Sequence, residues 1–232
     1  MPWRELANDY SIVNALEKKA PGGFGLGSAY TDYIADFNAC IKNGWYRAYS
    51  NSLNSPSIGG WNARYGALLV STRDSVIYHV YYVDRYSVMY TLERYSNDGG
   101  TTWSEWEYVN PPLQIGVEYR TTERYQEKPV YCKLVDCGSA PSNSLKKIDT
   151  GLDYTVIDRR LTPTGNMYAN SNDNFSIPCE STNVAGENLN ITHGTYRDSE
   201  NVRQDAIFIY TTSTTLTGYT VYAVLKYTKI TD

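Results

Sequence analysis

The chain has 232 residues, of which 41% are hydrophobic and 20% charged, and its formal net charge is −4. This composition excludes a disordered chain, and the lack of a basic stripe or polybasic patch argues against nucleic-acid binding and membrane attachment. Because 23 tyrosines stand against 4 phenylalanines, many rings are expected to lie half-buried with the hydroxyl in water, as on β-sheet surfaces and binding faces.

The start of the chain predicts a short neck helix and a joint. Pro2 suits a first helical turn, apolar residues follow at helical spacing, and Pro21-Gly22-Gly23 ends the pattern. A second helix is predicted over residues 31–44, with Thr31 as the N-cap and Gly44 as the stop. The first residues lack the apolar core of a signal peptide, so we expect a soluble protein that is not secreted by that route.

From residue 66 onward the hydrophobic period is that of strands. Antiparallel strands are predicted at residues 66–72, 75–83, 85–96, 102–109, 115–125, 128–138, 155–157, 175–177, 206–213 and 219–229. In the last of these, Val221 and Leu225 are expected on one face and Tyr222 and Val224 on the other. Residues 162–174 and 180–205 are predicted to be long polar loops, which are often functional in compact domains.

Pro111 and Pro112 disfavour a continuing ladder, so we place a domain boundary near residues 111–115. The predicted fold class is mainly β. Residues 1–23 form the neck helix and glycine-rich joint, residues 24–112 a small α+β domain with an antiparallel sheet, and residues 113–232 a C-terminal antiparallel β-sandwich.

Residues 96–103, SNDGGTTW, match the Asp-box pattern S-x-D-x-G-x-T-W that sialidases repeat around a β-propeller. The chain shows one box and no blade repeat, although a propeller needs about 40 to 45 residues per blade. We therefore interpret the box as a hairpin device. Asp98 is expected to bind backbone amides of the turn, Gly99 and Gly100 to supply positive φ, and Trp103 to pack back beneath the turn.

Residues with catalytic chemistry are better explained by structural roles. His79 lies in a predicted strand, where we expect a buried histidine with its hydrogen bonds satisfied. Arg120, Glu123, Arg124 and Glu127 hold a carboxylate pair of the kind glycosidases use. On an alternating strand such residues more often form ion pairs across strands or between subunits.

The sequence predicts no metal, no cofactor and no catalytic residue. Cys40, Cys132, Cys137 and Cys179 show no C-x-x-C spacing, so free and mostly buried thiols are expected rather than a disulfide or metal site. No glycine-rich phosphate loop and no nucleophile motif are found.

The polar segments between residues 158 and 204 hold the candidate ligand-binding residues: Tyr168, Asn170, Asp173, His193, Tyr196, Arg197 and Asp198. Sugars need aromatic faces to stack on and polar groups to pair with hydroxyls. Tyr196 and Arg197 are preferred, because a ring stacks on a sugar and a guanidinium grips a carboxylate or phosphate. A solvated loop is the alternative interpretation, and the aromatic-rich stretch around Trp61, Arg64 and Tyr65 is the second candidate site.

The order of DFNACIKNGWY, GALLV and RYSNDGGTTWSEWEYV over residues 24–110 resembles the pyocin-knob type of module in tail fibres of bacteriophages and phage-tail-like bacteriocins. The residues that carry this resemblance are Asp36, Asn38, Gly44, Tyr46, Gly66, Leu68, Val70, Arg94, Trp103 and Trp106. Residues 115–232 are similar to the C-terminal β-sandwich heads of phage tail fibres whose hosts are mostly Gram-positive and gut bacteria. TTERY-x-x-KPVY-x-K is the most specific part, and residues 158–204 do not follow the pattern.

These resemblances imply a phage or tailocin receptor-binding protein that attaches the particle to a bacterial cell-surface carbohydrate and is not an enzyme. The implied partners are a surface polysaccharide or wall glycan, two further copies in a homotrimer, and upstream tail-fibre or baseplate proteins. The implied location is the tail tip of the virion, after synthesis in the host cytoplasm. The alternatives are a sialidase-like glycan hydrolase or depolymerase acting on the same polymer, and a purely structural fibre segment.

Overall fold

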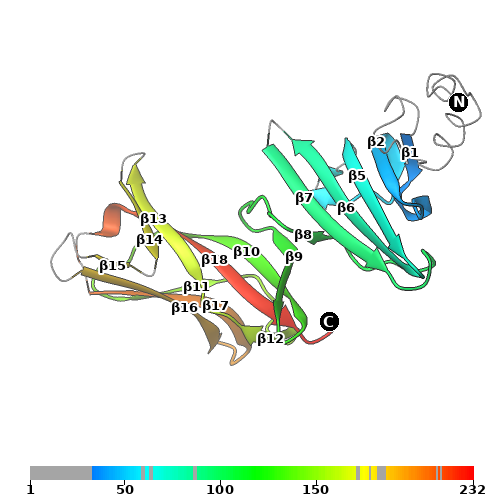
Figure 1. Cartoon of the computed structure of the whole chain (residues 1–232). Coiled ribbons are helices and arrows are strands. Elements are labelled where there is room, and N and C mark those ends of the chain that lie inside the picture. Colours follow the sequence, from blue (N-terminus) through cyan, green and yellow to red (C-terminus); the bar gives the residue numbers. More distant parts are fainter. Residues whose placement is uncertain are drawn as a thin grey trace, which may run out of the picture. The chain divides into compact units, whose positions relative to one another are not determined.

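The structure is a computed structural model, and it describes residues 33–58, 61–62, 65–85, 88–170, 173–177, 179–181, 187–212, 214 and 216–232. The protein is mainly β, as predicted, and the described residues contain strands and short 3-10 turns but no α-helix (Figure 1). No helix in this part of the chain is long and apolar enough to cross a membrane. The predicted neck helix and joint, residues 1–23, lie outside the described residues.

The chain divides into two compact units, residues 1–112 and 113–232. The first unit is built on one sheet, whose strands lie in the order β1 (Tyr33–Asp36), β2 (Gly44–Leu53), β5 (Gly66–Arg73), β6 (Val76–Arg85), β7 (Val88–Ser96) and β8 (Glu107–Tyr108). β1 runs parallel to β2 and the other pairs are antiparallel. A separate short ladder joins β3 (Ser57–Ile58) and β4 (Trp61–Asn62).

The helix predicted over residues 31–44 is wrong. From residue 33 this segment forms β1, the 3-10 turn η2 (Phe37–Ala39) and the start of β2. The carboxylate of Asp36 accepts a hydrogen bond from the Asn38 amide at 2.9 Å, which starts the turn. Ile34 and Phe37 are both buried, but one belongs to a strand and the other to the turn. Their spacing of three residues therefore imitates one face of a helix.

The sheet of the first unit buries one of its faces. On β6, Ile77, His79, Tyr81 and Val83 are buried, while Tyr78, Val80 and Tyr82 between them are partly exposed. The buried face is covered by η2 and by the segment that follows β7, because the ring of Trp106 lies 5.8 Å from that of Phe37 and 6.1 Å from that of Tyr81. This packing leaves an outer face on the other side of the sheet.

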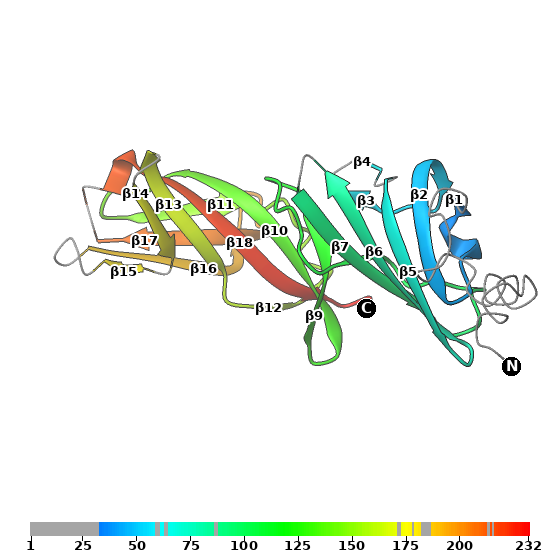
Figure 2. The same cartoon turned by 45° about the horizontal axis from the view of Figure 1, so that its top comes forward.

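The second unit contains two sheets (Figure 2). The first has the order β9 (Glu118–Tyr125), β10 (Lys128–Ser139), β18 (Thr220–Lys229), β13 (Thr164–Asn170) and β14 (Asp173–Ile177), with β12 (Ile157–Arg160) also paired to β18. The other has the order β11 (Leu145–Asp149), β17 (Arg203–Thr211), β16 (Glu187–Arg197) and β15 (Cys179–Ser181). A short 3-10 turn, η3 (Leu216–Gly218), precedes β18.

One hydrophobic core joins the two sheets of the second unit. Val221 and Leu225 of β18 face Ile207 and Ile209 of β17, and all four are fully buried. The predicted alternation of β18 is confirmed, since the intervening residues are partly exposed. The prediction that residues 162–174 and 180–205 are long loops is wrong, because most of the described residues in these segments form β13, the start of β14, β15, β16 and the start of β17, with a turn at residues 198–202.

Of the charged residues predicted to form ion pairs, Glu123 of β9 pairs with another strand, and Arg120 pairs with Asp232, which follows β18. Glu123 accepts from the ammonium of Lys226 at 2.6 Å, and Arg120 lies 2.8 Å from the carboxylate of Asp232. Glu118 forms a further pair with Lys229 at 2.5 Å. Such pairs hold the strand in register, although exposed pairs contribute little free energy each.

Three of the cysteines are free and buried, as predicted: Cys40 in the first unit, and Cys132 and Cys137 in the second. Burial raises the pKa of the Cys40 and Cys132 thiols to about 11 and that of Cys137 to about 12. These thiols are therefore protonated and unreactive in the folded protein. The side chain of Cys179 is outside the described residues.

We expect that substitutions in the turn can stabilise the hairpin between β9 and β10. Its two turn residues, Gln126 and Glu127, have positive φ values of 50° and 68°. Two-residue hairpin turns with positive φ at both positions favour the sequence Asn-Gly. Left-handed backbone costs a non-glycine residue about 1 kcal/mol. Gln126→Asn with Glu127→Gly should raise the free energy of unfolding by about 1 kcal/mol, measured by chemical denaturation. Glu127→Ala is the control and should give no gain; a double variant no more stable than the parent would contradict the argument.

Candidate carbohydrate-binding surfaces

The Asp box forms the turn that follows β7. Asp98 accepts hydrogen bonds from the backbone amide of Thr102 at 2.9 Å and from its hydroxyl at 2.6 Å, and Ser96 donates to Asp98 at 2.8 Å. Gly99 and Gly100 have φ values of 72° and 91°. The predicted hairpin role of this motif is confirmed, because every one of these bonds closes the turn.

We expect Asp98→Ala to lower the melting temperature of the first unit and to leave ligand binding unchanged. Hydrogen bonds from Thr102 lower the pKa of Asp98 to about 2, so its stabilising effect is complete above its unfolded pKa of about 3.9 and is lost as the pH falls toward 2. The five tryptophans all lie within residues 1–112, so tryptophan fluorescence follows this unit. Loss of binding at an unchanged melting temperature would contradict the structural role. Asp98→Asn should have a melting temperature between those of the parent protein and Asp98→Ala.

His79 and Arg94 form a buried structural cluster under the Asp box. The guanidinium of Arg94 lies 4.2 Å from the ring centroid of Trp103 and 4.4 Å from that of Trp106. Its Nε donates to Nδ1 of His79 at 3.2 Å, and Nε2 of His79 lies 2.7 Å from the carbonyl oxygen of Cys40. These two contacts require a neutral imidazole that carries its proton on Nε2. His79 is therefore structural, as predicted.

This cluster predicts a pH dependence for the first unit. Burial lowers the pKa of His79 to about 4, whereas an unfolded histidine titrates near 6.5. Between these values the unfolded chain takes up a proton that the folded chain excludes. Stability should therefore be complete above pH of about 6.5 and decrease as the pH falls toward 4. Urea unfolding followed by tryptophan fluorescence checks this. His79→Gln should reduce the dependence of the unfolding free energy on pH. An equally strong dependence in that variant would assign the effect to other groups.

The predicted ligand-binding residues lie on several strands and one turn, and their role in binding stays a prediction. Tyr168, Asn170 and Asp173 lie on β13 and β14, and their side chains are outside the described residues. His193 was expected in a loop but belongs to β16, and its side chain is 1% exposed. Tyr196 and Arg197 are consecutive residues of β16, so their side chains leave opposite faces of the strand and cannot hold one ligand together.

His193 takes part in a buried network centred on Asp205. The carboxylate of Asp205 is contacted by Nε2 of His193 at 2.7 Å, the hydroxyl of Thr150 at 2.6 Å and Nε of Arg160 at 2.7 Å. Burial alone would raise the pKa of Asp205, but hydrogen bonds from His193 and its neighbours hold it below its usual value. A fully buried ion with this many partners offers no surface to a ligand, and removing one of the partners would leave an uncompensated buried charge.

The hairpin between β16 and β17 uses the remaining predicted residues. Asp198 accepts from the amides of Glu200 and Val202 at 3.0 and 2.9 Å, and so closes the turn. Arg197 donates to the carbonyl of Asn201 at 2.8 Å. The ammonium of Lys147 lies 3.5 Å from the ring centroid of Tyr196 and covers one face of that ring. The hairpin is thus an exposed polar surface with one partly covered aromatic ring.

A larger aromatic surface lies on the outer face of the first unit's sheet. Tyr33, Tyr49 and Tyr65 are 47%, 47% and 50% exposed, and Trp45 is 38% exposed. The ring centroids of Tyr33 and Tyr49 are 5.3 Å apart and those of Tyr49 and Tyr65 are 5.6 Å apart, both edge to face. We call these three residues the tyrosine cluster.

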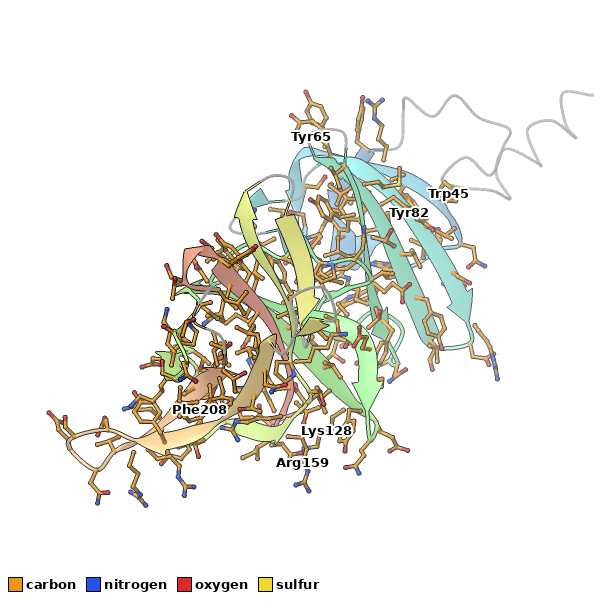
Figure 3. The ribbon with its side chains drawn as sticks, turned by 90° about the vertical axis from the view of Figure 1, so that its left-hand side faces the viewer. Trp45, Tyr65, Tyr82, Lys128, Arg159 and Phe208 are labelled. Carbon is orange, nitrogen blue, oxygen red and sulfur yellow. The ribbon has the colours of Figure 1, made fainter. Side chains whose placement is uncertain are left out.

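Trp45 and Tyr82 form a second group on this face, the Trp45–Tyr82 pair. Their rings are stacked with centroids 5.9 Å apart and planes 28° from parallel. Figure 3 shows both side chains on the sheet of the first unit, with Tyr65 toward one end of it. The two strands that carry the pair are separated by β5, where Gly66 lies so close to β6 that a Cβ atom would be 2.1 Å from the carbonyl oxygen of Tyr82.

Of the rings on this surface, Tyr65 alone is a candidate ligand-binding residue from the sequence. The other rings come from β1, β2 and β6, and only the pairing of these strands brings them together. The signal in the sequence is the large side chain at every second position, Trp45, Arg47 and Tyr49, but this stretch directly follows residues 31–44, for which a helix is predicted.

The chemistry of the outer face is that of stacking and hydrogen bonding. Exposed tyrosine and tryptophan rings bind the apolar faces of sugars, and tyrosine hydroxyls pair with sugar hydroxyls. Among the described residues, no group of three or more His, Cys, Asp or Glu side chains is placed to hold a metal ion.

Comparisons with protein-family models, with curated proteins and with solved structures found no match to this chain. The resemblance to phage tail-fibre modules thus stays a prediction from the sequence.

Proposed function

We propose that the protein is a receptor-binding protein of a phage or tailocin tail fibre, and that it attaches the particle to a carbohydrate of a bacterial surface. The observation that carries this proposal is the outer face of the first unit's sheet. It exposes the tyrosine cluster and the Trp45–Tyr82 pair on one surface. Contiguous exposed aromatic surface of this kind marks a binding site on a soluble protein.

The architecture supports the same proposal. Two mainly β units in one chain suit a knob followed by a head, and the residues that carry the tail-fibre resemblance are structural residues of the first unit. Arg94 and Trp103 form its buried cluster, and Gly66 allows the close approach of β5 and β6. Three copies on a fibre would raise a weak affinity per site through avidity on a repetitive polymer. We propose this trimer together with upstream fibre or baseplate partners.

Binding is proposed to occur without hydrolysis. Glu123 is one of the two carboxylates that could form a glycosidase pair, and it is bound by the ammonium of Lys226. Asp205 and His193 are buried in the core of the second unit. A reducing-end assay on purified cell-wall polysaccharide should therefore give no release above that of a buffer control, and release by the protein would instead favour the hydrolase.

The proposed function predicts that Trp45→Ala strongly reduces binding of fluorescently labelled protein to bacterial cells. Removing the indole deletes a large ring of the outer face together with its stacking on Tyr82, which contributes about 0.5 to 1.5 kcal/mol to folding. A melting curve of the variant separates this loss of stability from the loss of binding. Flow cytometry on a panel of Gram-positive and gut bacteria measures the effect. Free wall polysaccharide should compete with the binding.

Two comparison variants locate the surface. Tyr210→Ala removes a ring on β17 that is 46% exposed, and it should bind like the parent protein. Tyr196→Ala with Arg197→Ala tests the hairpin of the second unit. Loss of binding in that double variant, with full binding in Trp45→Ala, would move the receptor site to the second unit. No binding of the parent protein to any cell in the panel would count against the proposed function.

A further inference from the structure

The tyrosine cluster and the Trp45–Tyr82 pair lie at two positions along one strand. Trp45 and Tyr49 both belong to β2 and are four residues apart, so they leave the same face of the sheet about 13 Å from each other at the rise of a strand. One sugar ring cannot stack on both positions. A ligand that uses both groups must therefore be a chain of sugars that extends along β2.

The charge of this face indicates which polymer it fits. Across the described outward positions of β1, β2, β5 as far as Ser71 and β6 as far as Tyr82, Arg47 is the one charged residue. The nearest described charges beyond these positions are the exposed Arg73 at the end of β5 and the exposed Glu93 on β7. The guanidinium of Arg47 lies 5.5 Å from the ring centroid of Tyr33 and so extends the aromatic surface. Recognition of a phosphate or carboxylate repeat needs several cations in line. An uncharged polymer complements a surface of rings and hydroxyls with one cation.

We infer that the outer face of β1, β2, β5 and β6 binds an extended, uncharged polysaccharide at two positions, one at the tyrosine cluster and one at the Trp45–Tyr82 pair. This inference rests on the proposed function and adds the class of ligand. This ligand class differs from the anionic wall polymer that Arg197 is predicted from the sequence to bind. The aromatic groups act as stacking platforms, and Tyr49, between Tyr33 and Tyr65, is the centre of one of them.

The full-length chain is tested by affinity electrophoresis against uncharged polymers (mannan, dextran and galactan) and anionic ones (polygalacturonate and lipoteichoic acid). Retardation by an uncharged polymer is expected, and it should persist between about 0.05 and 0.5 M salt because no ion pairing is involved. Retardation only by anionic polymers, lost at the higher salt, would overturn the inference and leave the proposed function standing. Retardation by none of them would overturn the inference, and the cell-binding panel then decides the proposed function separately.

Oligosaccharides of the bound polymer, from disaccharide to octasaccharide, test the two positions by calorimetry. The octasaccharide should bind at least about tenfold more tightly than the disaccharide, because the second contact becomes intramolecular. Trp45→Ala and Tyr49→Ala should each abolish most of this gain with length. Tyr49→Phe keeps the ring and should retain it, and Tyr210→Ala should bind like the parent.

Equal affinity for short and long oligosaccharides would overturn the two-position arrangement. A second copy of this chain is the other candidate occupant of the outer face. Light scattering of the parent and of Trp45→Ala tests for this self-association. The same mass is expected for both proteins. A lower mass for Trp45→Ala would assign the outer face to self-association instead of glycan binding.

Discussion

A β-strand sends successive side chains to opposite faces, and both units of this protein depend on that alternation. In the first unit, β6 buries His79 and Tyr81 while it exposes Tyr78 and Tyr82. In the second, β17 buries Ile209 and exposes Tyr210. The pattern that builds each core therefore also decides which rings reach the surface, and a shift of one residue in register would exchange the two sets.

Each unit also buries a charged side chain inside a cluster of partners, and the desolvation cost of that charge is offset differently in the two units. Arg94 lies between two indole rings and donates to a neutral histidine, so aromatic faces take the place of water around the cation. Asp205 instead collects donors from separate strands and segments through Arg160, His193 and Thr150. Removing one partner of such a buried ion typically costs about 3 to 5 kcal/mol. These clusters thus specify how the strands around them are arranged.

The sequence predicted the mainly β fold where the strands alternate apolar and polar residues, as in Val221 and Leu225 of β18. It did not predict β16, because Asn190 and Thr192 make that strand look like a polar loop although Leu189 and Ile191 are buried. It misassigned residues 31–44 because a strand residue and a turn residue shared a helical spacing. The sequence carries a signal for the β2 part of the aromatic surface, but strand pairing, and not proximity in the chain, brings the rings of the whole surface together.

The buried thiols make each unit report on its own unfolding. A thiolate forms readily only where water reaches the sulfur, so a maleimide present during slow denaturation will modify Cys40 when the first unit opens, and Cys132 and Cys137 when the second does. Mass spectrometry of the digested chain would then give a separate rate of opening for each unit from its native cysteines, without any introduced residue.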